Sequence, residues 1–88
     1  WGGEEFIIFL PETQLADAMT LADRLRKKIA AIQLTTANKK KISFTSSFGV
    51  AQTSDGNISL DELISQADQQ LYYAKKRGRN CVCSELSC

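Results

Sequence analysis

The chain has 88 residues and a net charge of +1, from 11 Lys and Arg against 10 Asp and Glu. This length fits one small domain or part of a larger one, and the balanced charge gives no overall attraction to nucleic acid or to an anionic membrane. The chain contains no His, which excludes Ser-His-Asp and Cys-His catalysis within it and any zinc site that needs imidazole. Acid–base or metal chemistry must therefore use carboxylates, Lys, Tyr or Cys.

The first predicted element is a strand over residues 5–10, because this short apolar run is rich in aromatic and β-branched residues and ends at Pro11.

No segment approaches the roughly 20 apolar residues that a membrane span needs, and no signal peptide is visible. We therefore expect a cytoplasmic segment without membrane contact, while a parent protein can still carry a membrane anchor elsewhere. Because the chain begins at Trp1 rather than Met, we expect a processed or partial chain.

The next pattern predicts an amphipathic helix whose first turn is capped by the hydroxyl of Thr13. Apolar residues recur there at spacings of three and four, at Leu15, Met19, Ala22, Leu25, Ile29 and Ile32. Asp17 comes early in this segment and Lys27 and Lys28 come late, which suits the helix dipole. The pattern breaks over residues 35–38, and we interpret residues 39–41, which are all Lys, as a solvated loop.

From residue 41 to residue 51 the apolar period changes to two, which predicts a strand with one apolar face and one small, polar face. Gly49 lies on the small face, where another element or a ligand could approach closely. A turn is predicted over residues 54–57. Ser59 and Glu62 then form a capping box that opens a second helix, and Gly78 is placed to close this helix in the left-handed conformation.

A last short strand is predicted over residues 81–86, so the order is strand, helix, strand, helix, strand, an α/β pattern around one small sheet. Cys81, Cys83 and Cys88 lie close together near the C-terminus. An odd, clustered set does not form a disulfide framework, and a Cys-x-Cys pair supplies too few ligands for zinc. We interpret these residues as reduced cysteines.

Two segments carry residues suited to phosphoryl chemistry. At the N-terminus, Gly2 and Gly3 allow a sharp turn, and Glu4 and Glu5 follow at the mouth of the buried strand. Adjacent carboxylates on a strand point to opposite faces, so one of them can bind Mg²⁺ while the other makes a different contact. The alternative is a Gly-Gly turn with solvated acids.

The second segment is the end of the second helix, where Lys75, Lys76, Arg77 and Arg79 lie within five residues. These cations suit a helix C-terminus and can bind a polyphosphate. The alternative is a solvated helix end that complements the helix dipole. Phosphoryl transfer needs both a metal ligand and phosphate-binding cations, because catalysis there is mostly positioning and charge neutralisation.

Three motifs resemble those of the GGDEF family, the bacterial diguanylate cyclases, and occur in the same order as in that family. Gly-Gly-Glu-Glu-Phe at residues 2–6 resembles the signature, and Ser-Ser-Phe-Gly-Val-Ala at residues 46–51 resembles a family strand. Residues 67–80 resemble the closing helix, Ala-Asp-x-Ala-Leu-Tyr-x-Ala-Lys-x-x-Gly-Arg-Asn. The resemblance implies a palm-like, nucleotidyl-cyclase-like α+β fold with a small, mostly antiparallel sheet. It also implies that residues 1–88 are the C-terminal portion of a single domain, whose first metal-binding strand lies upstream.

The resemblance implies the family reaction, in which two GTP molecules condense to cyclic di-GMP with release of pyrophosphate. Gly2 and Gly3 match the glycines against which the nucleotide lies, and Glu4 matches the Mg²⁺ (or Mn²⁺) ligand implicated in activating the 3′-hydroxyl. Glu5 matches a second required acid. Lys75 and Arg79 match the pair that holds the GTP phosphates. Asp68 and Asn80 match structural positions of the family.

The resemblance further implies a catalytic homodimer and an upstream sensor or receiver domain in the full protein. An alternative is a non-catalytic GGDEF-like module that binds GTP or mediates dimerisation and regulates a partner domain. Another is a chain that self-associates through its unpaired strand edge. We expect the 88 residues alone to be inactive, because a lone carboxylate is a poor Mg²⁺ site.

Overall fold

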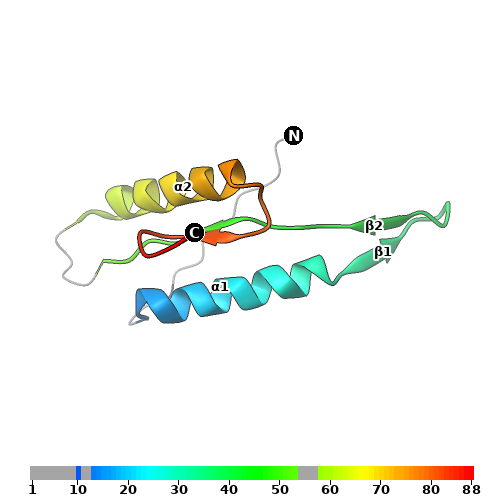
Figure 1. The fold of residues 1–88 in the computed structure, drawn as a ribbon, viewed down its shortest axis with the longest axis horizontal. Coiled ribbons are helices and arrows are strands. Elements are labelled where there is room, and N and C mark those ends of the chain that lie inside the picture. Colours follow the sequence, from blue (N-terminus) through cyan, green and yellow to red (C-terminus); the bar gives the residue numbers. More distant parts are fainter. Residues whose placement is uncertain (1–9, 11–12, 54–57) are drawn as a thin grey trace.

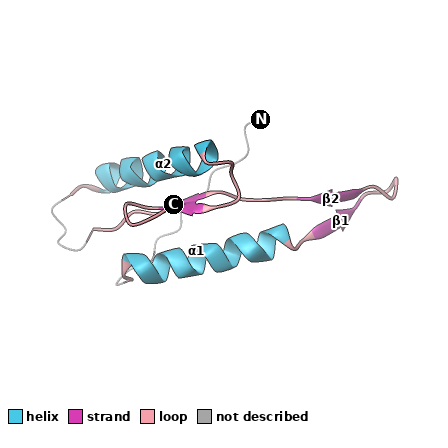
Figure 2. Ribbon diagram, viewed as in Figure 1, coloured by secondary structure: helices cyan, strands magenta, loops and turns pink. Residues whose placement is uncertain are grey.

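The computed structural model describes residues 10, 13–53 and 58–88, and all structural statements below concern these residues. The elements follow the order α1 (Leu15–Ala30), β1 (Gln33–Thr35), β2 (Lys41–Ser43), β3 (Phe48–Gly49), α2 (Leu60–Lys76) and β4 (Val82–Cys83). Helix α2 packs on β3 and β4, and α1 contacts β4. The two helices therefore lie on either side of the β3–β4 pair, whereas the β1–β2 hairpin extends away from this body (Figures 1 and 2). Neither described helix has the length and apolar character to cross a membrane.

Helix α1 confirms the predicted amphipathic helix but not its predicted cap. The cap residue is Gln14, which makes no side-chain capping hydrogen bond. The first helical amide, that of Leu15, instead donates to Oε1 of Gln52 at 3.0 Å. The prediction that Thr13 caps this helix was wrong, because the side chain of Gln52, which follows β3, accepts the hydrogen bond from the Leu15 amide. The helix also ends before Ile32, which is 45% exposed.

The predicted strand over residues 41–51 is divided into two strands with different partners. Strand β2 pairs antiparallel with β1, and Leu34 lies opposite Ile42. Strand β3 pairs parallel with β4, and the amides of Phe48 and Val50 donate to the carbonyls of Cys81 and Cys83, both at 2.9 Å. The mixed helix and strand class is confirmed. Within the described residues the strands form one antiparallel and one parallel pair, because the two halves of this segment face different neighbours. The predicted strand over residues 5–10 is not described apart from Leu10, so the single, mostly antiparallel sheet stays a prediction.

Helix α2 connects the parallel strands β3 and β4 and forms a β-α-β unit with them. Its capping box is confirmed, since Oγ of Ser59 accepts from the amide of Glu62 at 3.1 Å. Its close packing depends on Gly49, because a Cβ at this position would overlap the carbonyl oxygen of Ala67 and the amide nitrogen of Leu71. The small face of the predicted strand is therefore the face that α2 covers.

The buried apolar side chains of the described residues are mostly small. They are Leu15, Ala22, Ala74, Val82 and Cys83. Because small side chains bury little apolar area, each of these small core residues contributes little to the free energy of unfolding. The predicted strand over residues 5–10, apart from Leu10, and the predicted turn over residues 54–57 lie outside the described residues.

The cysteines differ from the prediction. Cys83 and Cys88 form a disulfide, and Cys81 is free. The amide of Ser84 donates to the carbonyl of Ser87 at 2.7 Å, which turns the C-terminal segment back onto β4. This turn brings Cys88 to Cys83, an arrangement that the spacing of the cysteines alone did not indicate.

Candidate functional site

The two predicted parts of the site have different outcomes. Gly2, Gly3, Glu4 and Glu5 lie outside the described residues, so their predicted roles stay predictions. The basic segment at the end of α2 is described in full.

The basic segment lies on a turn that reverses the chain between α2 and β4. Lys75 and Lys76 occupy the last turn of α2, and Arg77 is its cap residue. Gly78 has a φ of 117°, which confirms the predicted left-handed closure. Nothing lies within 4 Å of a Cβ built on Gly78, so the backbone conformation rather than space favours glycine there.

The left-handed conformation continues through the next two residues. Arg79 has a φ of 66° and Asn80 a φ of 51°. The amide of Arg79 donates to the carbonyl of Ala74 at 3.0 Å, which closes the helix end. Non-glycine residues adopt this conformation at a cost, so neighbouring contacts must hold them in it.

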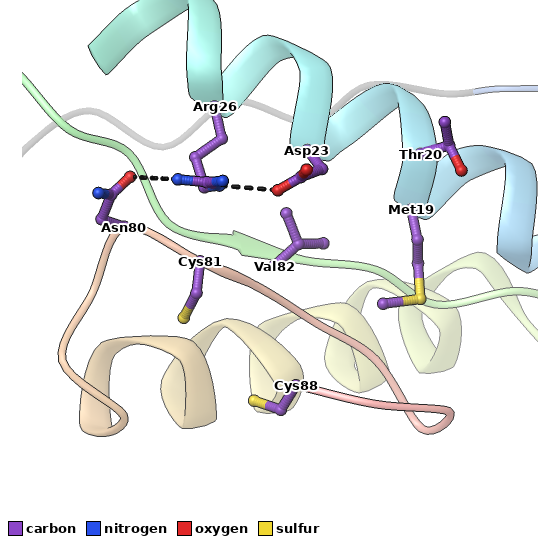
Figure 3. Close-up of a pocket in the computed structure, with 8 residues that line it drawn as sticks. All are labelled: Met19, Thr20, Asp23, Arg26, Asn80, Cys81, Val82 and Cys88. Atoms are coloured by element: carbon purple, nitrogen blue, oxygen red, sulfur yellow. Dashed lines mark hydrogen bonds and ion pairs between the residues drawn. The ribbon is translucent and has the colours of Figure 1, made fainter.

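Asn80 makes those contacts with two distant parts of the chain. Its amide donates to Oγ of Ser47 at 3.1 Å, and its Oδ1 accepts from Nη1 of Arg26 at 2.9 Å. Nε of the same Arg26 donates to Oδ1 of Asp23 at 2.8 Å. Figure 3 shows the Arg26 guanidinium between Asp23 and Asn80. The prediction of a structural role for Asn80 agrees with these contacts.

Charge is arranged around this network. The hydrogen bond from Arg26, followed by that from Lys27, lowers the pKa of Asp23 below its ordinary value of 3.8. Asp23 therefore remains ionised in the network. Nζ of Lys76 lies 5.5 Å from the centre of the Tyr72 ring, which gives this cation a partner within α2. Lys75 and Arg79, four residues apart, are both exposed at the turn.

A groove of about 470 Å³ lies next to this network, between α1 and the segment that leads into β4. Its lining, drawn in Figure 3, is Met19, Thr20, Asp23, Arg26, Asn80, Cys81, Val82 and Cys88. Arg26, whose guanidinium forms an ion pair with Asp23, is one of the residues that line the groove. The described residues contain no group of three His, Cys, Asp or Glu that could hold a metal ion. A bound metal would therefore need ligands outside residues 10, 13–53 and 58–88, which is where Glu4 lies.

The sequence did not predict that Arg26, Asp23 and Ser47 belong to the network around Asn80. The spacing of Asp23 and Arg26, three residues apart on a helix, was the available signal for their ion pair. Their connection to Asn80 joins positions 54 residues apart. No local pattern carries that information.

Comparisons with known proteins agree with the motifs. A family model described as "Diguanylate cyclase, GGDEF domain" matches residues 1–81. Diguanylate cyclase DgcM of Escherichia coli is 44% identical over 82 residues, which are 93% of this chain and 19% of the relative. Diguanylate cyclase DosC of Escherichia coli is 39% identical over 82 residues, which are 93% of this chain and 18% of the relative.

A third relative has a different name. Response regulator PleD of Caulobacter vibrioides is 37% identical over 83 residues, which are 93% of this chain and 18% of the relative. The chain spans about a fifth of the length of these curated relatives.

Proposed function

The chain belongs to the GGDEF family, and from this membership we propose that it forms the C-terminal portion of a diguanylate cyclase domain. The proposed reaction joins two GTP molecules into cyclic di-GMP. In each half-reaction a ribose 3′-oxygen bonds to the α-phosphorus of the other GTP, the bond from that phosphorus to the bridging oxygen breaks, and pyrophosphate leaves. The observation that carries the proposal is the family match over residues 1–81, which includes both the signature and the basic turn.

Each part of the site has a proposed role. Lys75 and Arg79 bind the phosphates, because charge-assisted hydrogen bonds to phosphate oxygens are stronger than neutral ones. Gly2 and Gly3 let the nucleotide lie against the backbone. Glu4 binds Mg²⁺ or Mn²⁺ and is implicated in accepting the proton of the 3′-hydroxyl, with Glu5 as a second acid. Bound Mg²⁺ would neutralise phosphate charge as the pyrophosphate leaves.

The proposed active species is a homodimer, in which each domain holds one GTP. The proposal places the first strand of the domain, with a further metal ligand, upstream of Trp1, together with a sensor or receiver domain. The isolated 88 residues then lack part of the metal site. We expect them to form no measurable cyclic di-GMP.

The test is cyclic di-GMP formation from GTP and Mg²⁺ by a protein in which the upstream half of the domain is restored. We expect product from the wild type, and a loss of at least about a hundredfold in Glu4→Gln, as for the removal of a group that acts in the transition state. Lys39→Ala, in the hairpin, is the matched surface control. A restored protein that forms no product, and binds GTP equally well with Glu4→Gln, would favour the non-catalytic module instead.

A further inference from the structure

The turn that carries Arg79 is conformationally unfavourable by itself. Gly78, Arg79 and Asn80 all have positive φ, and two of these residues carry side chains. Such conformations persist where surrounding contacts fix them, and they are common at ligand-binding positions. The contacts that fix this turn therefore also fix the direction in which the Arg79 side chain leaves the backbone.

The contacts come from both sides of the turn. On the helix side, the amide of Arg79 is bound to the carbonyl of Ala74. On the other side, Asn80 is bound through its backbone to Ser47 and through its side chain to Arg26. Arg79 therefore lies between its own contact with α2 and the two contacts of Asn80, which join residues 33 and 54 positions apart in the sequence.

Arg26 is suited to this task by its shape. A guanidinium presents several donors in one rigid plane, so Nε can bind Asp23 while Nη1 binds Asn80. A lysine has a single nitrogen and cannot reproduce this geometry. The Arg26 side chain is 19% exposed, whereas the neighbouring Arg24 is exposed, so the two arginines of α1 differ in surroundings and not in charge.

We propose that Arg26 is a positioning residue, which holds Asn80 and thereby orients Arg79 toward the phosphates of the bound nucleotide. The inference rests on the proposed role of Arg79 in phosphate binding. The proposed action of Arg26 on the phosphates is indirect, because its Nε donates to Asp23 and its Nη1 donates to Asn80, the residue next to Arg79. Positioning of this kind matters because a small displacement of a binding group weakens an oriented contact.

The first experiment measures the affinity of the 88-residue chain for inorganic tripolyphosphate by calorimetry. We expect Arg79→Ala and Arg26→Ala each to weaken binding about tenfold, and the double variant to be no weaker than Arg79→Ala, because both changes remove one oriented contact. Arg26→Lys keeps the charge and should behave as Arg26→Ala. Arg24→Ala should change binding by less than about twofold, as for an exposed charge. Losses that add in the double variant, or an unaffected Arg26→Ala, would overturn the proposal.

The second experiment does not depend on phosphate. Amide hydrogen exchange at Arg79 and Asn80 should accelerate at least about tenfold in Arg26→Ala but not in Arg24→Ala, because only the first variant removes the contact between α1 and Asn80. Asn80→Gly removes the same contact while allowing positive φ, and should accelerate exchange at Arg79. Unchanged exchange at both residues overturns the positioning role. Accelerated exchange together with an Arg79→Ala variant that binds tripolyphosphate normally would instead overturn phosphate binding by Arg79.

Discussion

Two basic segments of this chain have the same local chemistry and different structural surroundings. Lys39 in the β1–β2 hairpin and Arg79 after α2 are both cations with left-handed backbone, with φ of 62° and 66°. Each has further cations beside it in the sequence, Lys40 and Lys41 in the first case and Lys75 to Arg77 in the second. Local composition therefore does not distinguish the proposed phosphate-binding turn from the loop of the hairpin.

The hydrogen-bond partners of the two segments do distinguish them. In the hairpin, the amide of Lys39 donates to the carbonyl of Thr36 at 2.9 Å, and the amide of Lys40 donates to Oγ1 of Thr36 at 3.2 Å. Both contacts stay within the loop. The turn at Asn80 is tied to α1 and to Ser47, far away in the sequence. The proposed phosphate-binding turn therefore differs from the hairpin loop in that distant parts of the fold hold its backbone.

The largest expected effect is on the stability of the body that carries the α2 turn. Gly49→Ala places a methyl group against the backbone of α2, which cannot move aside as a side chain can. We expect a loss of about 3 kcal/mol or more in the free energy of unfolding. Leu34→Ala in the hairpin, where the side chain is 50% exposed, should cost less than about 1 kcal/mol. Urea denaturation followed by circular dichroism measures both, and equal losses would mean that body and hairpin are equally important for stability.

The second prediction compares the two cation clusters with equal changes of charge. Lys75→Ala with Arg79→Ala should weaken tripolyphosphate binding about a hundredfold, because two charge-assisted contacts are lost. Lys39→Ala with Lys40→Ala removes the same charge and also replaces one left-handed residue, yet should change the affinity by less than about twofold. Calorimetry at two salt concentrations separates oriented contacts from general attraction. Similar losses in the two double variants would show that net charge alone binds the phosphate.

The parts of the fold that were predicted from sequence depend on short spacings. The Ser59 cap and the left-handed Gly78 are signals within one or two helical turns, and both are confirmed. The failures have non-local causes. The cap residue of α1 is Gln14 rather than Thr13, and the distant Gln52 accepts the first helical amide. The period-two pattern over residues 41–51 continues across a change of strand partner. The link between Arg26 and Asn80 likewise exists only in the folded chain.

The third prediction compares one type of contact in both regions. Oγ of Ser59 accepts the amide of Glu62 in the body, and Oγ1 of Thr36 accepts the amide of Lys40 in the hairpin. Ser59→Ala should lower the free energy of unfolding by about 1 kcal/mol, as for other helix caps. Thr36→Ala should leave it unchanged within about 0.5 kcal/mol and accelerate amide exchange only at Lys40. A global effect of Thr36→Ala would show that the hairpin unfolds together with the body.

The smallest expected effect is a pH dependence of the network that holds the turn. Hydrogen bonds from Arg26 and Lys27 lower the pKa of Asp23 in the folded chain below its ordinary value of 3.8. Its contribution to stability is therefore fully present above that value and is lost as the pH falls through the lower folded pKa. Asp23 is partly exposed, so the contribution is small.

Asp23→Asn should accordingly lower the melting temperature slightly near neutral pH, and the difference from wild type should shrink once the pH falls below 3.8. Lys27→Gln is the control, because Lys27 reaches the other carboxylate oxygen at 3.3 Å and has no bond to Asn80. Its effect on melting should follow the same pH window, but amide exchange at Asn80 should stay normal. Asp23→Asn should accelerate that exchange, since Arg26 then loses its charged partner. If both variants leave Asn80 unaffected at every pH, Asp23 does not contribute to the difference between the two basic segments.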